Sequence, residues 1–265
     1  MNSKVEFYKI QGAGNDFVVL DNRDARFSSL TTNQIAFLCD RRFGIGADGL
    51  LLLSQSPDYA FRMEYFNSDG SRASFCGNGA RCICLFAVTI GAVSKAESFT
   101  FIADDGIHTA TVDAEKCWVD LTMKNVGTVS HEPDGAFVLN TGVPHYVRFV
   151  DDVDAIDIMS TAPAIRYSDA YKPAGVNVNF VTLDSPGHIR IRTYERGVEG
   201  ETLACGTGIT AAAISTYCKE GCTSVGVSAR GGDLRVSFTA NPDGSFSNVL
   251  LSGPAKIVFV GSISL

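Results

Sequence analysis

Two cysteines that lie 129 residues apart stand at the start of nearly identical motifs. The first motif is Cys76-Gly77-Asn78-Gly79-Ala80, and the second is Cys205-Gly206-Thr207-Gly208-Ile209. Small and apolar residues follow each motif and predict a helix, so each thiol is expected at a helix N-terminus, where the helix dipole favours the thiolate. Two matched thiols predict a site with two equivalent faces, at which one sulfur takes a proton and the other returns one.

The glycines after each cysteine predict a binding place for an anion. A Gly-x-Gly turn leaves backbone amides unshielded by side chains, and free amides at a helix N-terminus bind carboxylates. Two such turns holding one carboxylate would place the carbon next to it between the two sulfurs. The pattern therefore indicates proton abstraction α to a carboxylate with inversion. The sequence carries no pyridoxal lysine motif and no dinucleotide fingerprint, so a reaction without a cofactor is predicted.

Further polar residues stand at strand ends and turns close to the two motifs. Each asparagine taken alone is more typical of a turn than of a ligand contact. The Glu-Arg pair ends a strand shortly before the second motif, which favours a binding role over a solvated ion pair. These candidates are Asn15, Asn67, Asn78, Asn177, Glu195 and Arg196.

The offset of 129 residues also relates other parts of the chain. Tyr65 falls on Tyr194, and the segment from Asn15 falls on the segment from Pro144, which indicates two copies of one structural plan. Strand patterns dominate both copies, whereas the helices expected at about 77–90 and 206–219 are apolar around their circumference, as in helices enclosed by other elements. We therefore expect an α+β fold of two pseudo-symmetric domains, each a curled, mostly antiparallel, barrel-like sheet around a central helix, with both helix N-termini directed at a cleft between the domains.

The expected domain boundary lies where a strand pattern runs out into Asn, Gly, Ser and Pro, close to residue 123. Residues 1–123 would form the N-terminal domain with Cys76, completed by a C-terminal strand at 254–265. Residues 124–253 would form the C-terminal domain with Cys205.

Composition excludes several classes of function. The 265 residues carry a net charge of −7 without a Lys/Arg cluster, which argues against nucleic acid as a partner. The N-terminus lacks a signal-peptide pattern, and the apolar runs are too short to cross a bilayer, so a cytoplasmic protein without a membrane partner is predicted. Eight cysteines are too few for a secreted disulfide scaffold, and no second ligand pair completes a metal site, so no metal is predicted. The oligomeric state stays open, with a homodimer as one candidate.

Longer motifs resemble those of the diaminopimelate epimerase family. The matching segments follow the family's order across essentially the whole chain: 12–17, 40–49, 66–71, 76–82, 194–197 and 201–208. The resemblance implies a cofactor-independent isomerase with two pseudo-symmetric domains and a small amino-acid substrate. It would interconvert LL- and meso-2,6-diaminopimelate for lysine and peptidoglycan synthesis.

The same resemblance implies a role for each candidate residue. Cys76 and Cys205 would be base and acid, exchanging roles with direction, and His145 and Glu195 would assist them. The loops holding the carboxylate at the reacting centre would be Gly77, Asn78, Gly206 and Thr207. Contacts to the rest of the substrate, including its distal amino-acid end, would come from Asn15, Asn67, Asn177, Glu195 and Arg196.

Three departures from the family pattern concern substrate recognition. Val143 stands where many members carry a substrate-contacting Asn, Gly49 stands where some carry Gln, and the loop at 197–201 is one residue longer than the common form. We expect the activity to survive these changes. They concern the recognition of the distal end of the substrate, and hence its exact identity.

Other functions fit parts of the pattern. A proline or hydroxyproline racemase or epimerase also uses two thiols but needs no site for a distal carboxylate, so Arg196 and Asn67 favour diaminopimelate. A non-catalytic amino-acid-binding protein would have no need of both cysteines together with His145 and Glu195. A thiol–disulfide redox protein is disfavoured because neither cysteine lies in a local Cys-x-x-Cys motif.

Overall fold

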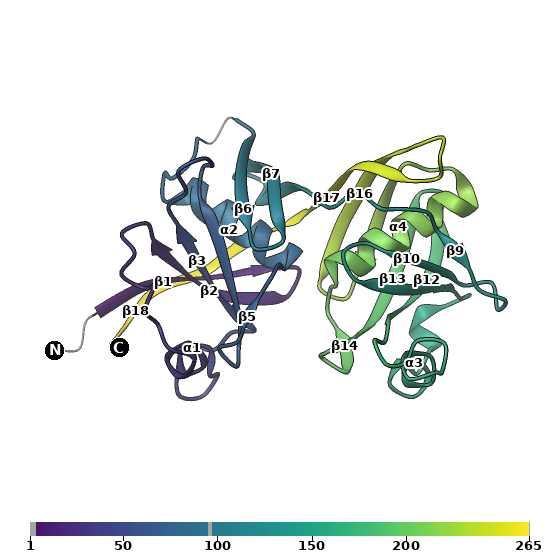
Figure 1. Cartoon of the computed structure of the whole chain (residues 1–265), viewed down its shortest axis with the longest axis horizontal. Coiled ribbons are helices and arrows are strands. Elements are labelled where there is room, and N and C mark those ends of the chain that lie inside the picture. The colour runs from purple at the N-terminus through teal and green to yellow at the C-terminus, as the bar shows by residue number, and fades with distance from the viewer. Residues whose placement is uncertain (1–3, 95–96, 265) are drawn as a thin grey trace. The chain divides into compact units, whose positions relative to one another are not determined.

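Two long helices enclosed by strands dominate the computed structural model, which describes residues 4–94 and 97–264. Contacts divide the chain into two units. The first comprises the described residues of Met1–Leu121 and Gly253–Leu265, and the second comprises Thr122–Ser252. Each unit is a curled sheet around one helix, α2 in the first and α4 in the second, which confirms the predicted α+β class (Figure 1).

The first unit contains two helices and most of nine strands. The helices are α1 (Thr32–Cys39) and α2 (Gly77–Thr89). The strands are β1 (Lys4–Gly12), β2 (Asn15–Asn22), β3 (Gly49–Ser54), β4 (Arg62–Asn67), β5 (Arg72–Ala73), β6 (Phe99–Ala103), β7 (Gly106–Asp113), β8 (Trp118–Thr122) and β18 (Lys256–Ser264). The last of these pairs with β1, antiparallel, so the C-terminal segment completes the sheet of the first unit.

The second unit repeats this order. Its helices are α3 (Ile158–Arg166), α4 (Gly206–Glu220) and the short 3₁₀ turn η1 (Val153–Ala155). Its strands are β9 (Ser130–His131), β10 (Phe137–Asn140), β11 (Pro144–Phe149), β12 (Asn177–Ser185), β13 (His188–Glu195), β14 (Gly200–Thr202), β15 (Ser224–Ala229), β16 (Gly232–Ala240) and β17 (Phe246–Pro254).

Strand pairing shows that the two units share one plan. In the first, β2 pairs with β3 parallel and β3 with β4 antiparallel; in the second, β11 pairs with β12 parallel and β12 with β13 antiparallel. Parallel neighbours need a crossover connection, and α1 and α3 stand in these two connections. The sequence repeat therefore corresponds to a repeat of topology.

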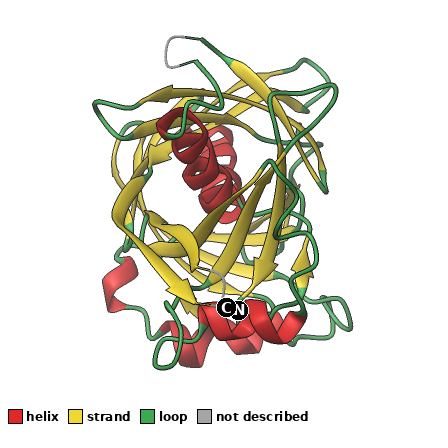
Figure 2. Cartoon of the chain, turned by 90° about the vertical axis from the view of Figure 1, so that its left-hand side faces the viewer, coloured by secondary structure: helices red, strands yellow, loops and turns green. Residues whose placement is uncertain are grey.

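The central helices are enclosed because their sequences are apolar on every side. All residues of α2 from Gly77 to Val88 are buried. Figure 2 shows strands curling around a central helix. In α4 the buried hydroxyl groups donate to carbonyl oxygens four residues earlier, each at 2.9 Å, so they need no outside partner: Thr210, Ser215 and Thr216. Each helix begins directly after its cysteine, as the motifs predict. In the part of the chain that is described, no helix has the length and apolar character needed to span a membrane.

Gly70 offers a test of how tightly the turn between β4 and β5 packs on α1. Its φ is +84°, and an added Cβ would lie 2.2 Å from the Thr32 carbonyl oxygen. We expect Gly70→Ala to lower the free energy of unfolding by about 2–4 kcal/mol, because a strained φ and a backbone clash act together. Urea denaturation measures this loss. Gly91→Ala is the matched control, with φ +68° and open space around the added Cβ, so it should lose only about 1 kcal/mol. Equal losses in the two variants would exclude the clash as the cause.

Candidate functional site

Cys76 occupies the N-cap position of α2 and makes no capping hydrogen bond with its side chain. Its Sγ lies 3.6 Å from Oδ1 of Asn15, at the start of β2. Asn78 Nδ2 donates to the same oxygen at 3.3 Å. The structure thus brings Cys76, Asn78 and Asn15 together, and one amide oxygen faces both the thiol and the helix turn.

Asn15 is held by a charged cluster on its other side. Its Nδ2 donates to Asp48 at 2.7 Å, and Arg41 donates to both Asp48 and Asp16, at 2.7 and 2.6 Å. Lys9 pairs with Asp16 at 2.6 Å. Burial raises the pKa of Asp16, but hydrogen bonds and charge from Arg41 and Lys9 outweigh burial and hold that pKa well below its usual range. The cluster therefore stays ionised near neutral pH and fixes the orientation of the Asn15 amide.

A buried arginine lies under the first turn of α2. Arg81 has no exposed surface, and its guanidinium donates to Asn78 Oδ1 at 2.8 Å and to the carbonyls of Gly77 and Pro254, each at 3.4 Å. None of these three acceptors, which all belong to the described part of the chain, is a carboxylate. Burial lowers the pKa of Arg81, yet a guanidinium stays protonated in proteins. This cation adds to the positive end of the α2 dipole, next to Cys76.

Asn67 closes the same end of the first sheet. Gly49 of β3 pairs with Phe17 of β2 on one side and with Asn67 of β4 on the other. This register places Asn67 two strands from the start of β2, where Asn15 stands. Its side chain donates to Ser71 Oγ at 3.1 Å within the turn to β5. Asn67 is thus positioned by the sheet at the end that carries Asn15.

Cys205 is the N-cap of α4 and is buried. Its Sγ lies 3.4 Å from Thr207 Oγ1, and Thr141 Oγ1 donates to the Thr207 carbonyl at 2.9 Å, which ties the turn to the end of β10. Glu195 ends β13. Burial raises its pKa, and a hydrogen bond with the Cys205 side chain opposes that shift. The structure thus pairs this thiol with a carboxyl group that holds a proton more readily than an exposed one.

His145 is fully buried near the start of β11. Its Nδ1 lies 3.1 Å from Nδ2 of Asn179, a residue of β12. Desolvation, and after it the charge of Arg196, lower the pKa of His145 to about 3, and the hydrogen bond with Asn179 opposes them only in part. The imidazole is therefore neutral at physiological pH.

Asn177 and Arg196 are joined directly. The Arg196 amide donates to Asn177 Oδ1 at 2.7 Å, and Asn177 Nδ2 donates to the Pro144 carbonyl at 3.3 Å. Asn177 also pairs with His145 in the parallel register of β11 and β12. Arg196 Nη1 donates to the Ala174 carbonyl at 3.1 Å, so its guanidinium is anchored in the loop before β12.

The predicted site residues therefore gather into two groups, one in each unit. The first group is Asn15, Asn67, Cys76, Gly77 and Asn78. The second group is His145, Asn177, Glu195, Arg196, Cys205, Gly206 and Thr207. Sequence reasoning missed Asp48, Arg81 and Asn179, which hold members of these groups in place. A lone arginine in an otherwise apolar helix, and an asparagine inside an apolar strand, were the available signals.

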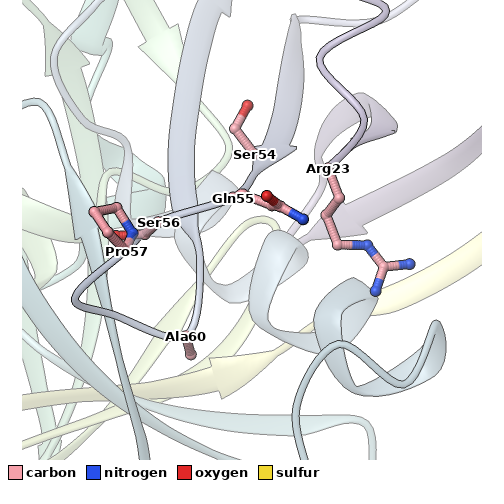
Figure 3. A pocket seen from close by; sticks show the side chains of 6 residues that line it. All are labelled: Arg23, Ser54, Gln55, Ser56, Pro57 and Ala60. Atoms are coloured by element: carbon pink, nitrogen blue, oxygen red, sulfur yellow. The ribbon is translucent and has the colours of Figure 1, made fainter.

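A hollow of about 450 Å³ lies elsewhere, beside the loop that follows β3 (Figure 3). Ser54 lines it at the end of β3 opposite Gly49, which pairs with Asn67. Arg23 also lines it, but its guanidinium is paired with Asp21 at 2.7 Å. No predicted site residue lines this hollow. Among the residues that the structure describes, no three side chains of His, Cys, Asp or Glu gather in a way that would hold a metal ion.

Comparison with known proteins identifies the family. The model of the family described as diaminopimelate epimerase matches residues 7–129 and 137–258. The diaminopimelate epimerase of Flavobacterium psychrophilum is 47% identical, covering 98% of this chain and 100% of that protein. The corresponding protein of Aquifex aeolicus is 40% identical, with 98% of each chain covered.

Solved structures share the fold at much lower identity. A Bacillus anthracis protein of the PhzF family superposes with a TM-score of 0.74 at 12% identity, over 99% of this chain and 100% of its own. A hydroxyproline epimerase from Agrobacterium vitis reaches 0.67 at 16% identity, over 100% and 94%. These likenesses concern the fold alone, whereas sequence similarity along nearly the whole chain is found with diaminopimelate epimerases. The chain is therefore a member of the diaminopimelate epimerase family.

Proposed function

We propose that this isomerase interconverts LL- and meso-2,6-diaminopimelate with Cys76 and Cys205 as its two proton-transfer groups and without a cofactor. The observation that carries the proposal is the equivalence of the two thiols, which cap the central helices of two units with the same topology. The two units would be two domains, 1–123 with 254–265 and 124–253, each supplying one thiol to a shared cleft.

The chemistry follows from what surrounds each sulfur. One cysteine, as thiolate, takes the α-proton, and the electron pair of the broken C–H bond stays on the α-carbon as an anion stabilised by the adjacent carboxylate group. Backbone amides at Gly77, Asn78, Gly206 and Thr207 would hold that carboxylate. The opposite thiol then gives its proton to the other face, so the substrate is inverted and the roles of the two sulfurs are exchanged.

The remaining polar residues suit the distal end of the substrate. Asn15, Asn67 and Asn177 present amides at sheet ends, and Arg196 supplies a guanidinium that binds a carboxylate bidentately. The substrate is a small amino acid, and we propose a cytoplasmic enzyme with neither nucleic acid nor membrane as its partner. A homodimer remains a candidate state, which sedimentation velocity would resolve.

Incubation with LL-diaminopimelate in deuterated water, under reducing conditions, tests this function. Deuterium is expected at one α-carbon as meso product forms, because a cysteine S–H exchanges with solvent before it returns the proton. Proline and hydroxyproline serve as comparison substrates. Exchange with either of these and none with diaminopimelate would refute the substrate. No exchange with any amino acid would favour a non-catalytic binding protein or a redox role for the thiols.

A further inference from the structure

Asn179 is a fully buried amide whose orientation is determined by two partners other than His145. Its Nδ2 donates to the Tyr146 carbonyl at 2.9 Å, and its Oδ1 accepts a hydrogen bond from Thr193 Oγ1 at 2.9 Å. A backbone carbonyl only accepts, so the group facing Tyr146 must be the NH₂ group. Turning the amide over would set two oxygens against each other at that contact.

The same NH₂ group faces His145 Nδ1 at 3.1 Å. An amide nitrogen is a donor only, so Nδ1 must accept, and the ring proton of a neutral imidazole must then reside on Nε2. The low pKa of His145, about 3, excludes the doubly protonated ring at neutral pH. The hydrogen-bond network thus selects one tautomer.

His145 Nε2 is buried, and no described residue accepts a hydrogen bond from it. A buried donor without a partner costs about 1–3 kcal/mol, so its retention points to an acceptor supplied by a ligand. Both ring nitrogens are then accounted for: Nδ1 uses its lone pair on Asn179, and Nε2 carries a proton. The imidazole has no free lone pair with which to take a proton.

The first turn of α4 packs against the same asparagine. A Cβ added at Gly208 would lie 2.5 Å from Asn179 Oδ1 and 3.3 Å from Thr193 Oγ1, so only glycine allows this close approach. Gly79, at the equivalent position in the first unit, faces apolar atoms of Leu51 and Phe17. Asn179 therefore connects the turn that carries Cys205 with His145, and the first unit has no amide in that position.

We propose that Asn179 is a positioning residue that fixes His145 as its Nε2–H tautomer, so that His145 acts in the epimerisation as a hydrogen-bond donor to an anion and not as a base. This inference rests on the proposed function for its chemistry. The anionic acceptor is either the substrate carboxylate or a thiolate of the reacting pair, and both would be stabilised by a neutral N–H donor in a dry site.

The tautomer is tested without catalysis, by nitrogen NMR of the enzyme labelled in histidine. We expect His145 to show a protonated Nε2 and an unprotonated Nδ1 at neutral pH. The His145→Gln variant assigns its signals among the four histidines. A shift of the Nε2–H signal on adding diaminopimelate would assign the carboxylate as acceptor, and a shift in the free enzyme as thiols are deprotonated would assign a thiolate. A proton on Nδ1 would overturn the proposal.

The activity of His145 variants distinguishes a hydrogen-bond donor at this position from a base. The amide nitrogen of glutamine reaches about as far as Nε2, so His145→Gln should keep kcat/KM within about tenfold, whereas His145→Ala should lose about 10²-fold or more. Equal losses in the two variants would refute the donor role. His188→Gln is the matched control, because the ring of His188 bonds to Ser228 Oγ at 3.1 Å, outside both site groups, and its activity should be unchanged.

Asn179→Asp reverses the tautomer. A carboxylate accepts from Nδ1–H, moves the ring proton to Nδ1, and raises the pKa of the imidazole. We expect kcat to fall at least about tenfold, with a new pH-dependent step in kcat and a visible Nδ1–H signal. Asn241→Asp, in the turn between β16 and β17, controls for the added charge. If Asn179→Asp does not fold, the activity of His145→Gln and the nitrogen NMR spectrum of the wild type still decide the proposal. Failure of wild-type exchange with diaminopimelate would refute the function and leave the tautomer standing.

Discussion

Replacing either Cys76 or Cys205 by alanine is expected to lower the rate of inversion by about 10³-fold or more, with the two variants failing in complementary ways. Inversion needs a proton taken from one face of the α-carbon and a proton returned to the other. With one sulfur left, the proton can only leave and return on the same face. Each variant should therefore exchange hydrogen with solvent at one configuration of the α-carbon without inverting it, and the second variant should do so at the opposite configuration.

Mass spectrometry after incubation in deuterated water measures both processes. LL- and meso-diaminopimelate are supplied separately, and the configuration of the labelled carbon is read by chiral chromatography. Cys218→Ala is the matched control, since Cys218 is exposed near the end of α4 and lies outside both site groups. Its rate of inversion should equal that of the wild type. Inversion above about 1% of the wild-type rate in either active-site variant would argue against two opposed thiols.

The parts of the fold nearest the thiols were the parts that could be predicted. Apart from Arg81 in α2 and a few hydroxyl groups in α4, the two central helices are apolar around their circumference, and a helix of this kind is buried. The cap of α1 was also predictable, because Thr31 and Gln34 form a capping box through short-range hydrogen bonds. The helix ends at Cys39 because Asp40 has an extended backbone.

Other helices and strands could not be recognised from sequence patterns. α3 was missed because Pro163 lies inside it and polar residues interrupt its periodicity, while the buried side chains of Ile158 and Ala162 hold it against the sheet. β9 and β14 are two and three residues long, too short for an alternating pattern. Their existence depends on the strands beside them.

The residues of the candidate site also fall into those that could be predicted from the sequence and those that could not. Residues next to the glycine motifs were identified from local sequence, because a cysteine before Gly-x-Gly already predicts its place at a helix end. The residues that hold them were not, since Asn179 reaches His145 only through the parallel register of β11 and β12, and Asp48 reaches Asn15 through that of β2 and β3. Such contacts depend on pairing between distant segments, which a single sequence does not reveal.

Arg81→Met is expected to lower kcat/KM by about 10- to 10³-fold while Cys76 becomes less reactive at neutral pH. The Cys76 thiolate favours the charged form of Arg81, and by the same interaction the buried guanidinium favours the thiolate over the thiol. Removing the cation should move the pH midpoint of Cys76 alkylation by iodoacetamide to a higher value. Peptide mapping by mass spectrometry distinguishes Cys76 from the other seven cysteines.

The second helix supplies the matched control for this variant. Thr210 occupies the position in α4 that corresponds to Arg81 in α2, and its hydroxyl bonds only within the helix, to the Gly206 carbonyl. Thr210→Val should leave the alkylation profile of both catalytic thiols unchanged. Arg81→Lys retains the positive charge but loses the planar set of guanidinium donors. The pH midpoint of Cys76 alkylation should therefore stay closer to the wild-type value in Arg81→Lys than in Arg81→Met.

Stability separates an electrostatic role of Arg81 from a structural one. Methionine removes a buried charge, which is often neutral or stabilising, but it leaves Asn78 Oδ1 without the donor that now lies at 2.8 Å, a loss of about 1–3 kcal/mol. These effects oppose each other, so the free energy of unfolding should change far less than the activity. A large loss of stability with an unchanged alkylation midpoint would mean that Arg81 supports only the fold. A raised midpoint in a stable protein would mean that the two matched thiols are made unequal by a single buried charge beneath one of them.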